Sequence, residues 1–159
     1  MQSQFCLVQA LKLYAGAKME NEYLNFNHSV GNNFWHLEWC PKYRYKIFRK
    51  DYIKNLCIIV LNEAAKRYNI QFKALNVQDD HLHAVASLPK GMNEIKAANL
   101  LKGFSSYLLI KLVPNLRLRY PKGSLWSQGY FAATVGFSDL SKTIDYVNSQ
   151  TMHHSFFSR

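Results

Sequence analysis

Two histidines one residue apart, His81 and His83, are the clearest chemical signal in this sequence. Side chains in a strand alternate between its two faces, so residues i and i+2 project from the same face. Both imidazoles would then point one way, while Leu82 between them points into the core. Two neutral imidazoles held close together form half of a metal site. The pattern is short, and an isolated pair of this kind is more often solvent-facing without a function.

A tyrosine and a glutamine, Tyr146 and Gln150, lie four residues apart in a segment with helical periodicity. Leu140, Ile144 and Val147 form the apolar stripe of that helix. Residues i and i+4 are neighbours on one side of a helix, so the phenol and the amide can face one target. A phenolate can attack phosphorus, and an amide oxygen is a hard ligand that suits Mg²⁺. The alternative is an amphipathic helix with one half-buried tyrosine.

Sequence spacing alone does not define a third ligand for the histidine pair. Asp79 and Asp80 are close to it, but they fit the tight turn between two strands. His36 lies on an earlier strand, where alternation places it on one face with Phe34 and Glu38. We therefore expect His36 to have a structural or DNA-contact role instead of ligating a metal.

The elements that must position these groups follow from hydrophobic periodicity and from turn residues. Strands are predicted at 34–40, 70–77, 81–88 and 129–135, helices at 51–68, 92–113 and 139–150, and a loop at 114–128. The order is β-α-β-β-α-β-α. Its first six elements form the split βαβ arrangement of an α+β, ferredoxin-like (RRM-like) sandwich, and the last helix is an addition. This fold hosts many functions, so function must be argued from the site.

The overall charge points to a polyanionic partner. Twenty Lys and Arg residues against ten Asp and Glu give a formal net charge of +10. Nucleic acid is the commonest partner of so basic a domain, and an anionic membrane surface is the competing interpretation. No stretch reaches the roughly 18 apolar residues of a membrane-spanning helix, and no basic amphipathic helix supports surface binding. Three cysteines without a CxxC pair indicate a reducing, cytoplasmic environment.

A basic and aromatic run follows the first predicted strand, and the helix at 92–113 carries further lysines. Such side chains supply phosphate contacts and stacking surfaces for nucleic acid. The alternative for any one of them is a solvated face. The candidate DNA contacts are Lys42, Tyr43, Arg44, Lys46, Arg49, Lys96 and Lys102.

The chain length of 159 residues fits one domain with one modest core. Residues 1–18 include several apolar side chains, but they lack the basic region and cleavage site of a signal peptide. We interpret residues 1–18 as an N-terminal extension that precedes a single domain at 19–159.

Four segments together resemble the single-tyrosine HUH transposases of bacterial and archaeal insertion sequences. They occur in the family's order and span roughly residues 34–150. Residues 35–44 are similar to the pattern H-x-x-W-C-x-K-Y-R, and residues 80–83 match D-H-U-H, where U is bulky and apolar. Residues 125–136 are similar to L-W-S-x-G-Y-F-x-A-T-V-G, and residues 146–150 match Y-I-x-x-Q. Each segment is modest alone, but four in order are specific.

The resemblance implies a role for each matched residue. Tyr146 would be the nucleophile that forms a 5′-phosphotyrosine link and frees a 3′-hydroxyl, and His81, His83 and Gln150 would hold Mg²⁺ or Mn²⁺. It further implies a substrate of single-stranded DNA with hairpin ends. The family also forms homodimers, often with the tyrosine helix of one subunit completing the histidine site of the other.

The chain departs from the family pattern in three places. Small residues at 84–87 follow the second histidine, which is a packing variation. The extension at 1–18 has no counterpart in the family, and the segment after Gln150 is short, as in a decayed element. The alternatives are a domesticated or inactive module that binds single-stranded RNA or DNA, and a related HUH nuclease of replication or conjugation.

Overall fold

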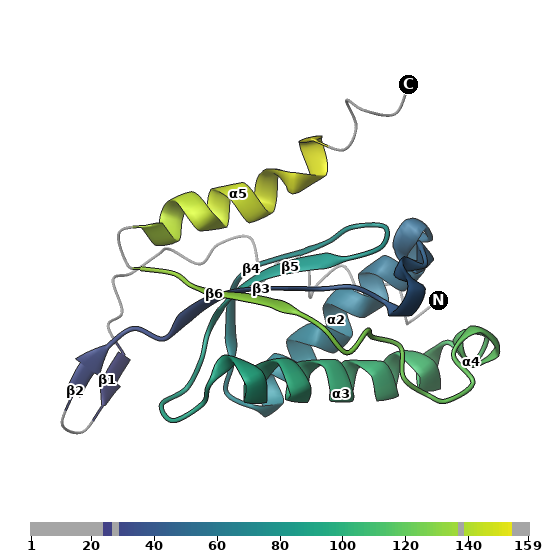
Figure 1. The fold of residues 1–159 in the computed structure, drawn as a ribbon, viewed down its shortest axis with the longest axis horizontal. Coiled ribbons are helices and arrows are strands. Elements are labelled where there is room, and N and C mark those ends of the chain that lie inside the picture. Colours follow the sequence, from purple (N-terminus) through teal and green to yellow (C-terminus); the bar gives the residue numbers. More distant parts are fainter. Residues whose placement is uncertain (1–23, 27–28, 137–138, 154–159) are drawn as a thin grey trace, which may run out of the picture. The chain divides into compact units, whose positions relative to one another are not determined.

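The computed structural model describes residues 24–26, 29–136 and 139–153 of the chain (Figure 1). The chain divides into two compact units, Met1–Gly31 and Asn32–Arg159. In the first unit, β1 (Leu24–Phe26) and β2 (Ser29–Gly31) pair as an antiparallel hairpin, which the sequence analysis did not predict. The predicted extension at 1–18 lies outside the described residues.

The second unit contains a four-stranded sheet with the order β4-β5-β3-β6, in which every neighbouring pair is antiparallel. This order is that of the split βαβ sandwich, so the predicted α+β, ferredoxin-like fold with an added C-terminal helix is confirmed. The main elements are β3 (Phe34–Trp39), α2 (Asp51–Arg67), β4 (Gln71–Val77), β5 (Leu82–Ser87), α3 (Glu94–Leu112), β6 (Phe131–Thr134) and α5 (Leu140–His153).

Three short helical turns join these elements: η1 (Lys42–Arg44), η2 (Ile47–Arg49) and α4 (Leu116–Arg119). The turn α4 lies inside the segment at 114–128 that was predicted to be a loop. It forms because Leu116 is buried against the main core, while its neighbour Leu118 is exposed. A single turn of this length leaves no periodic pattern to detect.

Helices α2 and α3 cover one face of the sheet and enclose the main core (Figure 1). Helix α2 buries Ile53, Cys57, Val60, Leu61 and Ala64, the apolar stripe that its periodicity predicts. Helix α3 begins at an N-cap, where the Asn93 side chain accepts a hydrogen bond from the Lys96 amide at 2.9 Å.

The opposite face of the sheet carries α5 (Figure 1). Val147 of α5 packs on Ala74 of β4 and Val85 of β5, and partly buried Leu140 and Ile144 flank this contact. The side-chain amide of Asn76 on β4 also donates a hydrogen bond to the main-chain carbonyl of Val147 at 2.8 Å. These contacts fix the residues next to Val147 over β4 and β5.

Candidate active site

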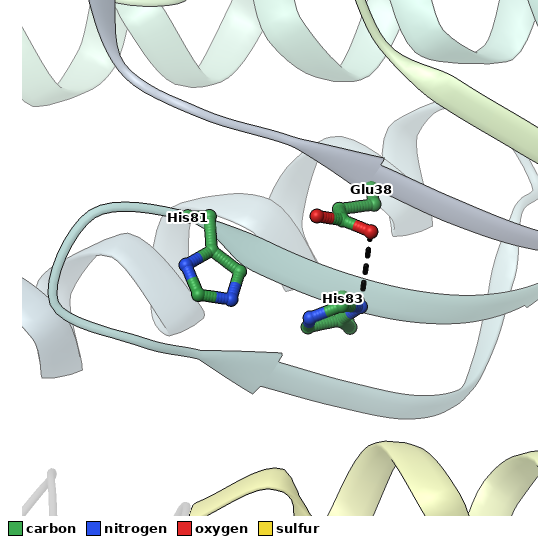
Figure 2. A group of neighbouring side chains, drawn as sticks. All are labelled: Glu38, His81 and His83. Carbon is green, nitrogen blue, oxygen red and sulfur yellow. Dashed lines mark ion pairs between the residues drawn. The ribbon is translucent and has the colours of Figure 1, made fainter. Parts of the chain in front are cut away.

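The histidine pair lies at the start of β5. Leu82 is fully buried in the main core, as strand alternation predicts, and the rings of His81 and His83 meet on the side away from that core. Their centroids are 5.0 Å apart and their planes are nearly perpendicular (Figure 2). The fold therefore brings together the two imidazoles that the sequence singles out.

A carboxylate that the sequence does not single out as a ligand joins the pair. Glu38 on β3 lies directly opposite His83 in the strand register, and its Oε2 is 3.6 Å from His83 Nδ1 (Figure 2). One potential ligand atom from each of Glu38, His81 and His83 lies within 4.8 Å of the others. Two imidazole nitrogens and a carboxylate oxygen are donors that divalent cations accept, so this group fits a metal ion.

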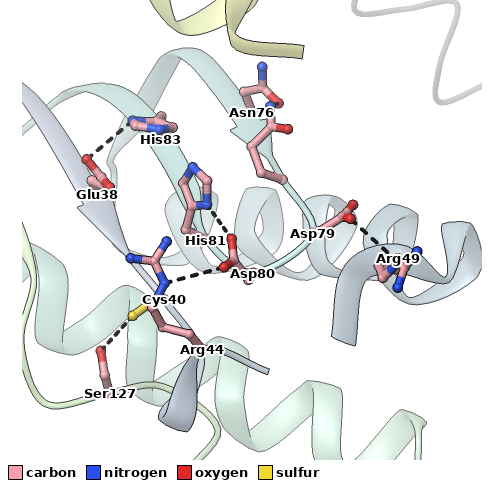
Figure 3. Close-up of polar contacts among 11 residues, drawn as sticks. Glu38, Cys40, Arg44, Arg49, Asn76, Asp79, Asp80, His81, His83 and Ser127 are labelled. Carbon is pink, nitrogen blue, oxygen red and sulfur yellow. Dashed lines mark hydrogen bonds and ion pairs between the residues drawn. The ribbon is translucent and has the colours of Figure 1, made fainter. Parts of the chain in front are cut away.

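Asp80 contacts the pair from the turn between β4 and β5. Its Oδ1 lies 2.7 Å from His81 Nδ1, and its Oδ2 accepts a hydrogen bond from Arg44 Nε at 3.3 Å (Figure 3). Burial raises the pKa of Asp80, but the hydrogen bonds and charges of His81 and Arg44 outweigh it and hold the pKa below its usual range. Asp80 is therefore an ionised acceptor, and His81 Nδ1 must carry the proton that it receives.

The predicted nucleophile also reaches this site within the same chain. The ring of Tyr146 on α5 has its centroid 6.4 Å from that of His83 and stands nearly perpendicular to it. Tyr146 is 53% exposed, so its phenol is open to a ligand. Gln150 lies one turn further along α5 and is partly buried. The structure thus brings Tyr146 next to His83, whose ring also contacts that of His81, although more than sixty residues separate Tyr146 from the histidine pair.

His36 fills the space between these groups. Its Nε2 is 3.3 Å from His83 Nδ1, its ring stacks on that of His83, and its centroid is 6.3 Å from that of Tyr146. Burial lowers the pKa of His36, although the negative charge of Glu38 opposes this shift. The ring of His36 packs against those of His83 and Tyr146, which fits the structural alternative of the structural or DNA-contact role that we expect for it.

A groove of about 360 Å³ runs beside the histidine pair, and its lining includes Glu38, Arg44 and His81. Its wall is built from two distant segments. The Lys42 amide donates to the Leu125 carbonyl at 2.8 Å, and the Ser127 amide donates to the Cys40 carbonyl at 2.9 Å. The Cys40 thiol and the Ser127 hydroxyl are also in contact, 3.6 Å apart (Figure 3). An open groove beside a group that could hold a metal ion can admit an extended substrate.

Comparison with known proteins decides the family. Residues 29–150 match the family model described as Transposase IS200 like. The chain belongs to the IS200-like transposases. The transposase for insertion sequence element IS200 of Salmonella typhimurium is 28% identical over 123 residues, which cover 77% of this chain and 80% of that protein. The ISDra2 transposase TnpA of Deinococcus radiodurans is 27% identical over 116 residues, 73% of this chain and 82% of that protein.

Solved structures confirm the fold of this IS200-like transposase. A putative transposase from Deinococcus radiodurans superposes with a TM-score of 0.64 at 23% identity, covering 79% of this chain and 96% of that one. The REP-associated tyrosine transposase bound to a REP hairpin gives a TM-score of 0.57 at 13% identity, covering 87% and 74%. The predicted relationship to the single-tyrosine HUH transposases is thus confirmed. Among the described residues, no helix is long and apolar enough to span a membrane.

The basic run of the transposase lies in the turns η1 and η2. Arg44 and Arg49 reach back to the turn before β5, where Arg44 pairs with Asp80 and Arg49 Nε lies 3.7 Å from Asp79 (Figure 3). Tyr43 and Arg44 have positive φ angles of 62° and 49°. The remaining candidate contacts are placed as follows: Tyr43, Lys46 and Lys96 are exposed, and Lys42 is partly buried.

The structure corrects the expectation that Lys102 contacts DNA. Lys102 is only 9% exposed, and its Nζ donates hydrogen bonds to the main-chain carbonyls of Gln128 at 2.9 Å and Gly129 at 3.2 Å. It also lies over the Tyr130 ring, and burial lowers its pKa. Lys102 therefore holds the segment before β6 against α3 in the transposase, because its amine is engaged by the main chain.

Proposed function

We propose that this IS200-like transposase cleaves and rejoins single-stranded DNA, with Tyr146 as the nucleophile and a divalent cation bound at His81 and His83. One observation supports this proposal most strongly: the exposed phenol of Tyr146 and the imidazole of His83 lie side by side, with ring centroids 6.4 Å apart. They come from different elements, and the packing of α5 on the sheet is what brings them together.

In the proposed cleavage step, the oxygen of Tyr146 bonds to the scissile phosphorus and the bond from phosphorus to the 3′ oxygen breaks. The phenol proton is lost and the departing oxygen gains one, which leaves a 5′-phosphotyrosine and a free 3′-hydroxyl. Rejoining reverses the step, since a 3′-hydroxyl attacks the phosphotyrosine and restores the phenol. The number of phosphate ester bonds is unchanged throughout, so no external energy source is needed.

The proposed cation is Mg²⁺ or Mn²⁺, held by His81, His83 and Gln150 as the family resemblance implies, with Glu38 as an additional donor. When bound, such an ion polarises the scissile phosphate as a Lewis acid. The protein residues supply the rest: neutral imidazoles bind, the Glu38 carboxylate balances charge, and Asp80 fixes the ring of His81.

The proposed substrate is single-stranded DNA with hairpin ends. The net charge of +10 supports a DNA partner, and a structurally similar transposase has been solved bound to a REP hairpin. We propose that the protein acts in the cytoplasm as a homodimer. The placement of Tyr146 beside His83 of its own chain supports assembly of each site within one subunit. The proposed DNA contacts are Lys42, Tyr43, Arg44, Lys46, Arg49 and Lys96.

The test is covalent capture. The protein is incubated with stem-loop single-stranded DNA and Mg²⁺ or Mn²⁺, and adducts are resolved on a denaturing gel. We expect Tyr146→Phe to abolish the adduct while DNA binding persists, because phenylalanine keeps the ring but has no nucleophile. Tyr107→Phe, at an exposed tyrosine of α3, is the matched control and should leave the adduct intact.

The metal ligands are tested in the same assay. His81→Ala should prevent adduct formation at every Mg²⁺ concentration while changing the folding free energy little. An adduct formed by Tyr146→Phe, or full cleavage by His81→Ala, would contradict the proposal. DNA binding by the wild-type protein without any adduct would instead favour a single-stranded nucleic-acid-binding module.

A further inference from the structure

The turn before β5 contains two adjacent aspartates, Asp79 and Asp80, with similar partners. Each pairs with an arginine of the basic run, Asp79 with Arg49 and Asp80 with Arg44. They differ in burial, since the Asp80 side chain is 20% exposed and that of Asp79 is 55% exposed. They also differ in their contacts, because the carboxylate of Asp80 lies 2.7 Å from His81 Nδ1, one of the shortest side-chain contacts among the described residues.

The contact between Asp80 and His81 determines which ring nitrogen of His81 carries the proton. A carboxylate can only accept hydrogen bonds, so the short contact requires a proton on His81 Nδ1. The neutral ring then has its lone pair on Nε2, which is the form that a metal ligand needs. In Figure 3, Asp80 lies on the side of His81 away from His83. The Nε2 side of the ring is therefore turned toward the shared site.

Arg44 fixes the carboxylate from its other side. Its Nε donates to Oδ2 of Asp80, while Oδ1 of the same carboxylate faces His81. A side chain bonded through both oxygens cannot rotate without losing one of its partners. The segment that follows β3 is thus connected through Asp80 to the first histidine of the pair.

We propose that Asp80 is a positioning residue that holds His81 as the Nδ1–H tautomer with Nε2 presented to the metal, and that Arg44 locks Asp80 in place. This inference rests on the proposed function only in taking His81 as a metal ligand. It assigns Arg44 to the support of the metal site as well as to the basic surface. Outer partners of metal-binding histidines typically change metal affinity by about 10- to 100-fold when they are removed.

The experiment compares Asp80→Asn with Asp79→Asn, its matched control in the same turn. Long-range ¹H–¹⁵N NMR spectra of the metal-free proteins report the tautomer of each histidine. We expect His81 to be the Nδ1–H tautomer in the wild type and in Asp79→Asn. In Asp80→Asn it should change toward a mixture, because an amide can either donate or accept.

Metal binding is measured separately, by titrating each protein with Mn²⁺ and following the free ion by electron paramagnetic resonance. We expect about 10- to 100-fold weaker binding for Asp80→Asn and at most a small change for Asp79→Asn. Arg44→Gln should weaken binding less than Asp80→Asn, because it loosens the carboxylate without removing it. Thermal melting of each variant verifies that it is folded before the comparison.

Two results would overturn the inference: an unchanged His81 tautomer in Asp80→Asn, or equal effects of Asp79→Asn and Asp80→Asn on Mn²⁺ affinity. A different result is expected if the proposed function is wrong but this inference is right. In that case the wild type would form no adduct with DNA, while the tautomer of His81 would still depend on Asp80.

Discussion

The two faces of the four-stranded sheet are built very differently. Helices α2 and α3 cover one face with a continuous core that includes Leu61, Leu82 and Leu101, all fully buried. On the other face, α5 rests on a small cluster in which Val147 is the buried residue of the helix. The helix that carries Tyr146 therefore has much less buried apolar surface holding it than the scaffold helices have.

This contrast indicates that folding and site assembly depend on separate contacts. Burying one apolar side chain contributes roughly 1.5–3 kcal/mol, so the α5 contact is a small part of the apolar burial in the molecule. Elements with few buried contacts open locally at a lower free energy than global unfolding. We infer that α5 can leave the sheet while the scaffold remains folded, which would expose the rings of His36 and His83.

The largest expected effect is on the face of the sheet that α2 and α3 cover. Leu101→Ala removes a fully buried side chain of α3 and should lower the free energy of unfolding by about 2–5 kcal/mol. Chemical denaturation followed by circular dichroism measures this change. The site face should be unaffected, so the yield of DNA adduct per folded molecule should equal that of the wild type. A reduced yield per folded molecule would show that the two faces are coupled.

A smaller effect on stability is expected from substitutions of two lysines in α3. Comparing them separates a lysine that supports the scaffold from one that lies on the surface. Lys102→Met keeps most of the side-chain volume but leaves the carbonyls of Gln128 and Gly129 without their donor. It should cost about 1–3 kcal/mol of stability and leave the salt dependence of DNA binding unchanged. Lys96→Met, at an exposed position, should do the reverse and reduce the salt slope by about 1. Equal effects of both substitutions on stability would contradict this assignment.

The smallest expected effect concerns the site face itself. Val147→Ala removes two methyl carbons from the contact of α5 with Ala74 and Val85. This loss should weaken the docking of α5 on the sheet by about 1–2 kcal/mol. Hydrogen exchange should become faster in α5 and stay unchanged in β4 and β5, because only the docking of the helix is weakened. Asn148→Ala, at the exposed neighbouring position, is the control. Faster exchange throughout the sheet would show that α5 unfolds together with the scaffold.

The sequence predicts the four strands and three long helices of the sandwich and the approach of Tyr146 to the histidine pair, because periodicity and four ordered motifs constrain them. It does not predict the β1–β2 hairpin or the short turn α4. It does not predict Glu38 as a neighbour of His83, since that contact depends on the register between β3 and β5. Lys102 was misassigned for a simpler reason. It follows Lys96 by six residues, which is about 240° around a helix, so the two side chains face different surroundings.

Asp80 is both a turn residue and a hydrogen-bond partner of other side chains, and the sequence indicates only the first of these roles. Its position between two strands correctly indicates a turn, and the Gln78 amide does donate to the His81 carbonyl across that turn at 2.8 Å. The side chains that the carboxylate reaches are Arg44, from the turn after β3, and the neighbouring His81. Arg44 has a positive φ of 49°, which sequence periodicity does not predict. Sequence reasoning could therefore place the aspartate but not its partners.

The pairing of residues 40–42 with residues 125–127 has a consequence for engineering. Main-chain hydrogen bonds and the β-bridge between Pro41 and Trp126 join these two segments into one structural unit, although more than eighty residues separate them. A chimera that takes only the first segment from a relative would pair it with a second segment from a different protein. The contacts between the two segments would then not match unless both were exchanged. Exchanging these segments with those of a relative would therefore require both to be transplanted together.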